Sequence, residues 1–160
     1  MNIQVISLFP QMFETICEQG VVGRAVKQGK VNVAVTNPRD FTQDKHRTVD
    51  DRPYGGGPGM VMQAEPVLKA WQKAVGRKKD QKRIKTLVMG PRGKKFDTKM
   101  AKDLVKKYDH LVLISGRYEG IDTRVQKALK AEEISIGDYV LTGGELPALA
   151  IVDSTARQVP

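Results

Sequence analysis

Cysteine and histidine are scarce in this chain of 160 residues, which contains one cysteine, Cys17, and two histidines. A lone cysteine excludes an internal disulfide framework, and no spacing of cysteine and histidine resembles a zinc site. Long apolar runs are also missing, and the first nine residues lack the basic start of a signal peptide. The sequence therefore predicts a cytoplasmic protein without a membrane segment.

Two nucleotide-binding fingerprints are missing as well. No expected strand is followed by Gly-x-Gly-x-x-Gly, which argues against the usual dinucleotide site. The glycine-rich run 55–59 lacks the Gly-Lys-Ser/Thr ending of a P-loop, so a phosphate-transfer enzyme is the weakest interpretation.

His46 lies among three aspartates between residues 44 and 51, but their spacing matches no metal-ligand motif and favours a solvated loop histidine.

Positive charge is in excess and unevenly distributed. The chain has 27 Lys and Arg against 18 Asp and Glu, a net charge of +9, yet residues 132–153 contain no Lys or Arg. Residues 77–85 form a dense basic run, and further lysines follow between residues 94 and 107. A basic balance attracts polyanions by counterion release, so nucleic acid is the expected partner; the alternative is a merely solvated lysine-rich surface.

Apolar periodicity predicts alternating strands and helices. Expected strands cover residues 2–9, 31–36, 84–89, 111–114 and 134–141, and expected helices cover residues 11–19, 21–28, 65–75, 98–107, 123–130 and 146–160. Gly20 is predicted to end the first helix, and Cys17 and Trp71 are interpreted as core residues of apolar helix faces. This order predicts one α/β domain with a mostly parallel sheet flanked by helices.

Glycine-bearing loops follow three of the expected strands. The loops after residues 111–114 and 134–141, with residues 90–93, can bring the backbone close to a ligand because glycine has no Cβ. Tyr118, Glu119 and Tyr139 add an aromatic surface and a charge. Ligands bind at strand ends in open α/β sheets, so we expect a pocket here, the alternative for any single loop being an ordinary turn.

A long polar connection covers residues 39–59. Connections of this length are usually functional or disordered. Arg39, Arg47, Arg52 and Tyr54 favour a segment that closes over a large substrate, with arginine on phosphate and tyrosine on a base.

Several long motifs carry a family resemblance. They are Ile-Ser-Leu-Phe-Pro at 6–10, Pro-Arg-Asp-Phe at 38–41, Asp-Asp-Arg-Pro-Tyr-Gly-Gly-Gly-Pro-Gly-Met at 50–60, Gly-Arg-Tyr-Glu-Gly-Ile-Asp at 116–122, Ser-Ile-Gly-Asp-Tyr-Val-Leu at 135–141 and Gly-Gly-Glu-Leu-Pro at 143–147. Together they resemble the amino-terminal domain of the bacterial tRNA (guanine-N1)-methyltransferases, which belong to the SPOUT class of S-adenosylmethionine-dependent RNA methyltransferases.

The resemblance implies a SPOUT-type deep trefoil knot in the carboxy-terminal part and an obligate homodimer with shared active sites. It also implies that S-adenosylmethionine lies bent among three loops. The cofactor-binding residues so implied are Met89, Gly90, Pro91, Gly116, Tyr118, Glu119, Gly120, Ser135, Ile136, Gly137, Asp138, Tyr139, Val140, Leu141, Gly143, Gly144 and Pro147.

The implied reaction methylates N1 of the guanosine just 3′ of the tRNA anticodon. N1 must lose its proton, and the negative charge that spreads toward O6 needs a cation. The resemblance assigns this cation to Arg157. It places Glu119 beside the methyl donor, where it helps to position the sulfonium or a magnesium ion; the alternative for Glu119 is a buried ion pair.

Full-length members of the family continue with a flexible linker, which carries the proposed general base, and a small helical domain. Because the chain stops at Pro160, we expect residues 1–160 to be a single cofactor-binding domain with little or no activity alone. The alternative is an RNA-binding module without cofactor function, which would use residues 39–59 and 77–85.

Overall fold

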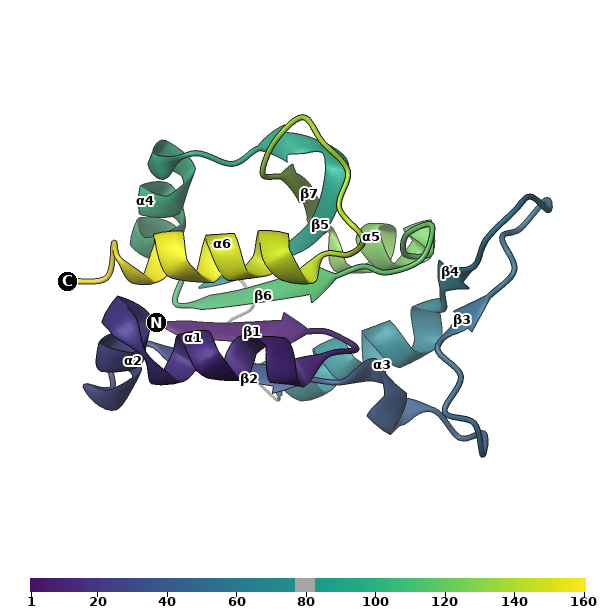
Figure 1. Ribbon diagram of the computed structural model, residues 1–160, viewed down its shortest axis with the longest axis horizontal. Helices are drawn as coiled ribbons and strands as arrows, with labels where there is room; N and C mark the ends of the chain where they lie inside the picture. The colour runs from purple at the N-terminus through teal and green to yellow at the C-terminus, as the bar shows by residue number, and fades with distance from the viewer. Residues whose placement is uncertain (77–82) are drawn as a thin grey trace.

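The computed structural model of the chain describes residues 1–76 and 83–160 (Figure 1). Their main feature is a five-stranded sheet in the order β2-β1-β6-β5-β7, in which all neighbouring strands are parallel. The strands are β1 (Asn2–Ile6), β2 (Asn32–Thr36), β5 (Ile84–Lys95), β6 (His110–Ser115) and β7 (Glu132–Ser135). The predicted α/β class with a mostly parallel sheet is confirmed.

Helices cover both faces of this sheet. One face carries α1 (Glu14–Glu18), α2 (Gly20–Lys27), α4 (Thr98–Lys107) and α6 (Glu145–Ala156), and the other carries α3 (Ala64–Val75) and α5 (Thr123–Leu129). A hydrophobic core lies on each face of the sheet: the first core lies under α1, α2, α4 and α6, and the second core lies under α3 and α5. Successive side chains of β6 point to opposite faces, so that Leu111 and Leu113 join the first core, whereas Val112 and Ile114 join the second core. Every residue of β6 is buried, as expected for a central parallel strand.

Several strand ends differ from the prediction, beginning with β1, which ends at Ile6 instead of Phe9. β7 ends at Ser135 instead of Leu141, because the Ser135 hydroxyl accepts a hydrogen bond from the Gly137 amide (3.2 Å) and donates one to the Gly137 carbonyl (2.9 Å). This local turn replaces ladder hydrogen bonds. β5 does not end at Met89: Met89 and Lys94 both pair with Ile134, so the predicted loop 90–93 is an irregularity within a longer strand.

The amino-terminal helical region is also divided differently. The segment predicted as one helix forms a 3₁₀ turn, η1 (Pro10–Phe13), followed by α1. α1 ends at Glu18, and Gly20, the predicted stop, follows just after this end and is also the first residue of α2. Gln19 is extended and Gly20 has φ +64°, so the chain changes direction between α1 and α2.

Cys17 is half-buried, and burial together with the nearby Glu18 raises the pKa of its thiol. Trp71 is half-buried against the second core and donates to the Thr86 hydroxyl (2.9 Å), which supports its interpretation as a core residue.

The long polar connection contains an ordered arm. It begins with η2 (Pro38–Phe41) and continues to a two-stranded antiparallel hairpin, β3 (Asp50–Asp51) and β4 (Val61–Met62). Figure 1 shows this arm projecting from the end of the molecule opposite the two chain termini.

Candidate functional site

A cavity of about 360 Å³ lies near the carboxyl ends of β5, β6 and β7. Its wall consists of the irregular part of β5, the loop after β6 and the loop 136–144 after β7. The volume lies within the range of small-molecule sites in proteins. The pocket that the sequence predicted at the strand ends is therefore present.

Most of the predicted cofactor-binding residues line this cavity. The lining residues among them are Met89, Gly90, Pro91, Gly116, Tyr118, Glu119, Gly120, Ser135, Ile136, Gly137, Tyr139, Val140, Leu141, Gly143, Gly144 and Pro147. Asp138 is exposed and lies outside the wall. Arg157 is exposed at the carboxyl end of α6, roughly 15 Å along the helix from Pro147 at a rise of about 1.5 Å per residue.

The backbone segments come very close together where the walls of the cavity meet. The Gly144 amide donates to the Gly116 carbonyl (2.8 Å), and the Ser115 hydroxyl donates to the Gly144 carbonyl (3.2 Å). A Cβ on Gly144 would lie 2.7 Å from the Ser115 Cα and 3.0 Å from the Met89 Cβ. Only glycine fits here, so the chain crosses directly over the ends of β6 and β5.

The arm holds the loop that follows β6. The Met62 amide donates to the Gly120 carbonyl (2.9 Å), and the Glu119 amide donates to the Met60 carbonyl (2.9 Å). The Glu119 side chain lies over Gly59, where a Cβ would approach its Cγ to 2.4 Å. The glycine-rich run of the arm thus makes room for Glu119. Because the Glu119 side chain is exposed, the alternative role in a buried ion pair is wrong.

Further polar residues of the wall were not predicted from the sequence. They are Arg92, Arg117, Thr123, Gln126, Glu133 and Thr142. The Glu133 carboxylate lies against Gly90 and accepts a hydrogen bond from the Gln126 amide (3.4 Å). The predicted strand began at residue 134, so the alternation of side chains that places Glu133 on the wall was not available as a signal.

Arg117 and Glu145 join three parts of the chain beside the cavity. The Arg117 Nε lies 2.8 Å from the Glu145 Oε2, and the Glu145 side chain is only 1% exposed. The other Glu145 oxygen accepts from the Ser7 hydroxyl (2.9 Å). The guanidinium also donates to the Thr142 carbonyl (3.3 Å) and lies 4.5 Å from the centre of the Phe9 ring. These contacts fix the loop 136–144 to the end of β1 and the start of α6.

The family follows from comparison with known proteins. A family model described as tRNA (Guanine-1)-methyltransferase TrmD matches residues 1–160. The chain belongs to this family. The tRNA (guanine-N(1)-)-methyltransferase of Pseudoalteromonas atlantica is 54% identical over 156 residues, which cover 98% of this chain and 58% of that protein. The enzyme of Pasteurella multocida is 51% identical over 160 residues, with 100% and 64% covered.

A solved structure supports the same assignment. The crystal structure of tRNA (m1G37) methyltransferase from Aquifex aeolicus matches with a TM-score of 0.87 and 39% sequence identity, covering 100% of this chain and 70% of that chain. The family resemblance seen in the motifs is therefore confirmed. The chain spans 58 to 65% of the length of the curated relatives that it matches.

None of the helices formed by residues 1–76 and 83–160 has the length and apolar character needed to cross a bilayer. In the same residues, no group of three or more His, Cys, Asp or Glu side chains could hold a metal ion. A magnesium ion at Glu119 stays a prediction. Most of the basic run 77–85 lies outside the described residues.

Proposed function

We propose that residues 1–160 form the methyl-donor domain of a tRNA (guanine-N1)-methyltransferase and that the cavity binds S-adenosylmethionine. The observation that carries this proposal is that two loops with family motifs, the one after β6 and the one after β7, converge with the irregular part of β5 on one cavity. The RNA-binding module without cofactor function, by contrast, gives no reason for such a cavity.

The residues of the wall fit this ligand. Glycines of the wall, such as Gly143, have no Cβ and let an adenine come close enough to hydrogen-bond the backbone. The Glu119 and Glu133 carboxylates suit a positively charged sulfur by Coulomb attraction, and a tyrosine ring face attracts the same charge. When bound, S-adenosylmethionine would supply a methyl group on that sulfonium.

The position of Arg157 supports an active site shared between two copies of the chain. Arg157 lies at the end of α6 remote from the pocket, so we assign it to stabilise the guanosine O6 in the site of a second copy. The surface also exposes large apolar side chains of neighbouring elements, which a second copy would cover: Phe9, Met12, Val21 and Leu146. A homodimer is therefore part of the proposal.

We include the trefoil knot in the proposal as well. After β7, at one edge of the sheet, the chain returns across the end of β6 at Gly144 and continues as α6. α6 then packs against α4, α2 and β6, all formed earlier in the chain. A return of this kind between earlier elements is what threading requires.

Calorimetric titration of the 160-residue chain with S-adenosylmethionine, combined with light scattering, tests the proposal. We expect saturable binding near one site per subunit of a dimer. Tyr139→Ala should weaken binding by about tenfold through loss of its aromatic contact. Asp138→Ala is the matched control, because this neighbouring side chain lies outside the wall, and it should leave affinity unchanged.

A folded chain that fails to bind the donor would refute the donor site and favour the RNA-binding module. Methyl transfer to unmodified tRNA, measured in parallel, should be weak. The relatives named as tRNA (guanine-N(1)-)-methyltransferases are longer than the part of them that these 160 residues match. Efficient transfer by the 160 residues alone would contradict this part of the proposal.

A further inference from the structure

We propose that Arg39 binds a phosphodiester group of the RNA acceptor at the mouth of the donor pocket. This inference rests on the proposed function, because it requires an RNA whose target base enters the pocket. It adds a contact residue for the acceptor on the arm, a part of the chain to which the family motifs assigned no site residue.

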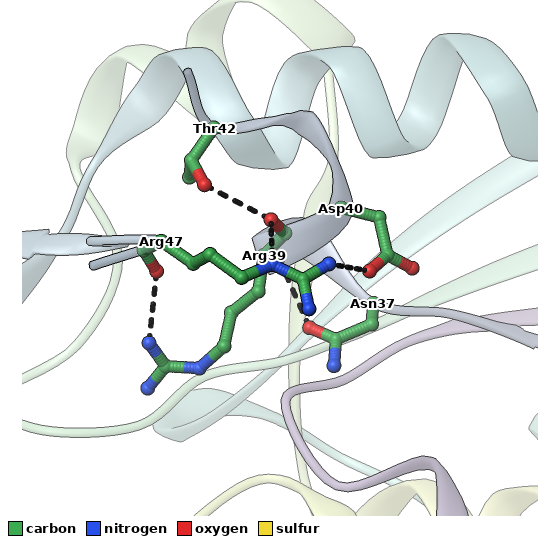
Figure 2. Close-up of polar contacts among 5 residues, drawn as sticks. All are labelled: Asn37, Arg39, Asp40, Thr42 and Arg47. Carbon is green, nitrogen blue, oxygen red and sulfur yellow. Dashed lines mark hydrogen bonds and ion pairs between the residues drawn. The ribbon is translucent and has the colours of Figure 1, made fainter. Parts of the chain in front are cut away.

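The backbone of Arg39 is held in one position by its neighbours. Its amide donates to the Asn37 side-chain oxygen (3.0 Å), and its carbonyl accepts from the Thr42 hydroxyl (2.9 Å) and the Arg47 Nε (3.3 Å). Figure 2 shows these contacts closing around the η2 turn. The side chain of Arg39 therefore starts from an ordered base, which lowers the entropy cost of fixing it on a ligand.

The guanidinium of Arg39 is also oriented. Its Nη1 donates to the Arg47 carbonyl (2.9 Å), and its Nη2 lies 3.5 Å from the Tyr118 hydroxyl. In Figure 2 the Arg39 side chain folds back toward the Arg47 carbonyl, while the Arg47 side chain turns the other way to Asp40. Tyr118 lines the pocket beside Glu119, so Arg39 lies at the pocket rim.

Arg47 and Arg39 differ in whether a carboxylate balances their positive charge. Arg47 forms an ion pair with Asp40. Arg39 is half-buried, and within the described residues no carboxylate lies at ion-pair distance from it; its two side-chain contacts are to neutral oxygens. A guanidinium has five N–H donors, so most remain free. A fixed, uncompensated fork of donors matches the geometry of a phosphate.

The placement at the rim explains why the ligand should be RNA backbone. Sequence-specific RNA enzymes act on unstacked bases, and a nucleotide whose base enters the pocket leaves its flanking phosphates at the mouth. The donor's own carboxylate is the competing anion for Arg39. Arg39 does not line the cavity, which favours the phosphate.

Fluorescence anisotropy with a labelled RNA hairpin carrying an anticodon-like loop, measured over a series of salt concentrations, tests the proposal on the 160-residue chain. Arg39→Ala should weaken RNA binding by about tenfold and reduce the slope of log K against log salt by about 0.7 to 1. If the alanine variant folds poorly, Arg39→Gln takes its place in the test. This variant removes the charge but keeps a side-chain donor, and it should show the same reduction of the salt slope. Lys99→Ala, an exposed charge on α4 far from the arm, is the matched control and should change little.

Three results would overturn the proposal. The first is an unchanged salt slope in a folded Arg39 variant, and the second is a wild-type chain that binds the donor but no RNA. The third is a loss of S-adenosylmethionine affinity in the Arg39 variant, measured by calorimetry, with RNA binding intact, which would assign Arg39 to the donor carboxylate. Each of these results leaves the donor site standing, whereas failure of the wild-type chain to bind S-adenosylmethionine refutes the proposed function itself.

Discussion

Removing Arg117 should destabilise the domain far more than removing a surface charge. Arg117→Ala leaves the Glu145 carboxylate, which is 1% exposed, without its ionic partner. Breaking a buried ion pair from one side costs about 3 to 5 kcal/mol. In a domain of this size, 1 kcal/mol corresponds to about 2 to 4 °C, so we expect the melting temperature to fall by about 6 to 20 °C.

A double-mutant cycle isolates this effect. Glu145→Gln keeps a side chain that can accept from the Ser7 hydroxyl but removes the charge. The double variant Arg117→Ala/Glu145→Gln should therefore be more stable than Arg117→Ala alone. Urea unfolding followed by circular dichroism measures all four chains, and Lys69→Ala, which breaks an exposed ion pair with Glu65, is the control with little expected change. A loss below about 1 kcal/mol for Arg117→Ala, or no recovery in the double variant, would refute the reasoning.

Three further predictions concern single residues. Glu119→Gln should weaken S-adenosylmethionine binding in calorimetry without lowering the melting temperature, since the side chain is exposed; unchanged affinity would remove Glu119 from the donor site. Asp122→Ala should cost about 1 kcal/mol because the carboxylate caps α5 through the Arg124 amide (2.9 Å). Hydrogen bonds from Arg124 lower the pKa of Asp122 from 3.8, so this contribution is complete well above pH 3.8 and is lost as the pH falls below it, which a pH series of unfolding curves checks. The raised pKa of Cys17 predicts slow reaction with a thiol reagent at pH 7 until the chain unfolds; fast labelling of the native chain would contradict it.

Elements whose signals are local were predictable from the sequence. β6 is apolar from Leu111 to Ile114, as expected for a strand with both faces buried, and the starts of α4 and α5 follow from the capping aspartates. Asp97 accepts from the Met100 amide (2.7 Å), as its position before the apolar face of α4 predicts. The end of β7 was missed because a serine hydroxyl, which apolar periodicity does not register, turns the backbone at Ser135.

The glycine loops of the site were predictable, but their polar partners were not. Gln126 lies on α5 and Glu133 on β7, and nothing in the local pattern separates a polar side chain that faces a pocket from one that faces water. Arg117 stands within a recognised motif, yet its role depends on Glu145, Thr142 and Phe9, which lie far away in the chain. Asp138 and Arg157 came from the resemblance alone, and the structure places both outside the wall.

Three glycines of the site show why a shared residue type can conceal different physical roles. Gly90 leaves space for the Glu133 carboxylate, Gly59 leaves space for the Glu119 side chain, and Gly144 allows two backbone segments to touch. The first contact is with the end of a flexible side chain, so Gly90→Ala needs only a shift of Glu133 and should alter ligand binding more than stability. Gly144→Ala would press a Cβ onto the backbone of Ser115, which cannot move without displacing β6, and it should therefore prevent the crossing on which the pocket depends.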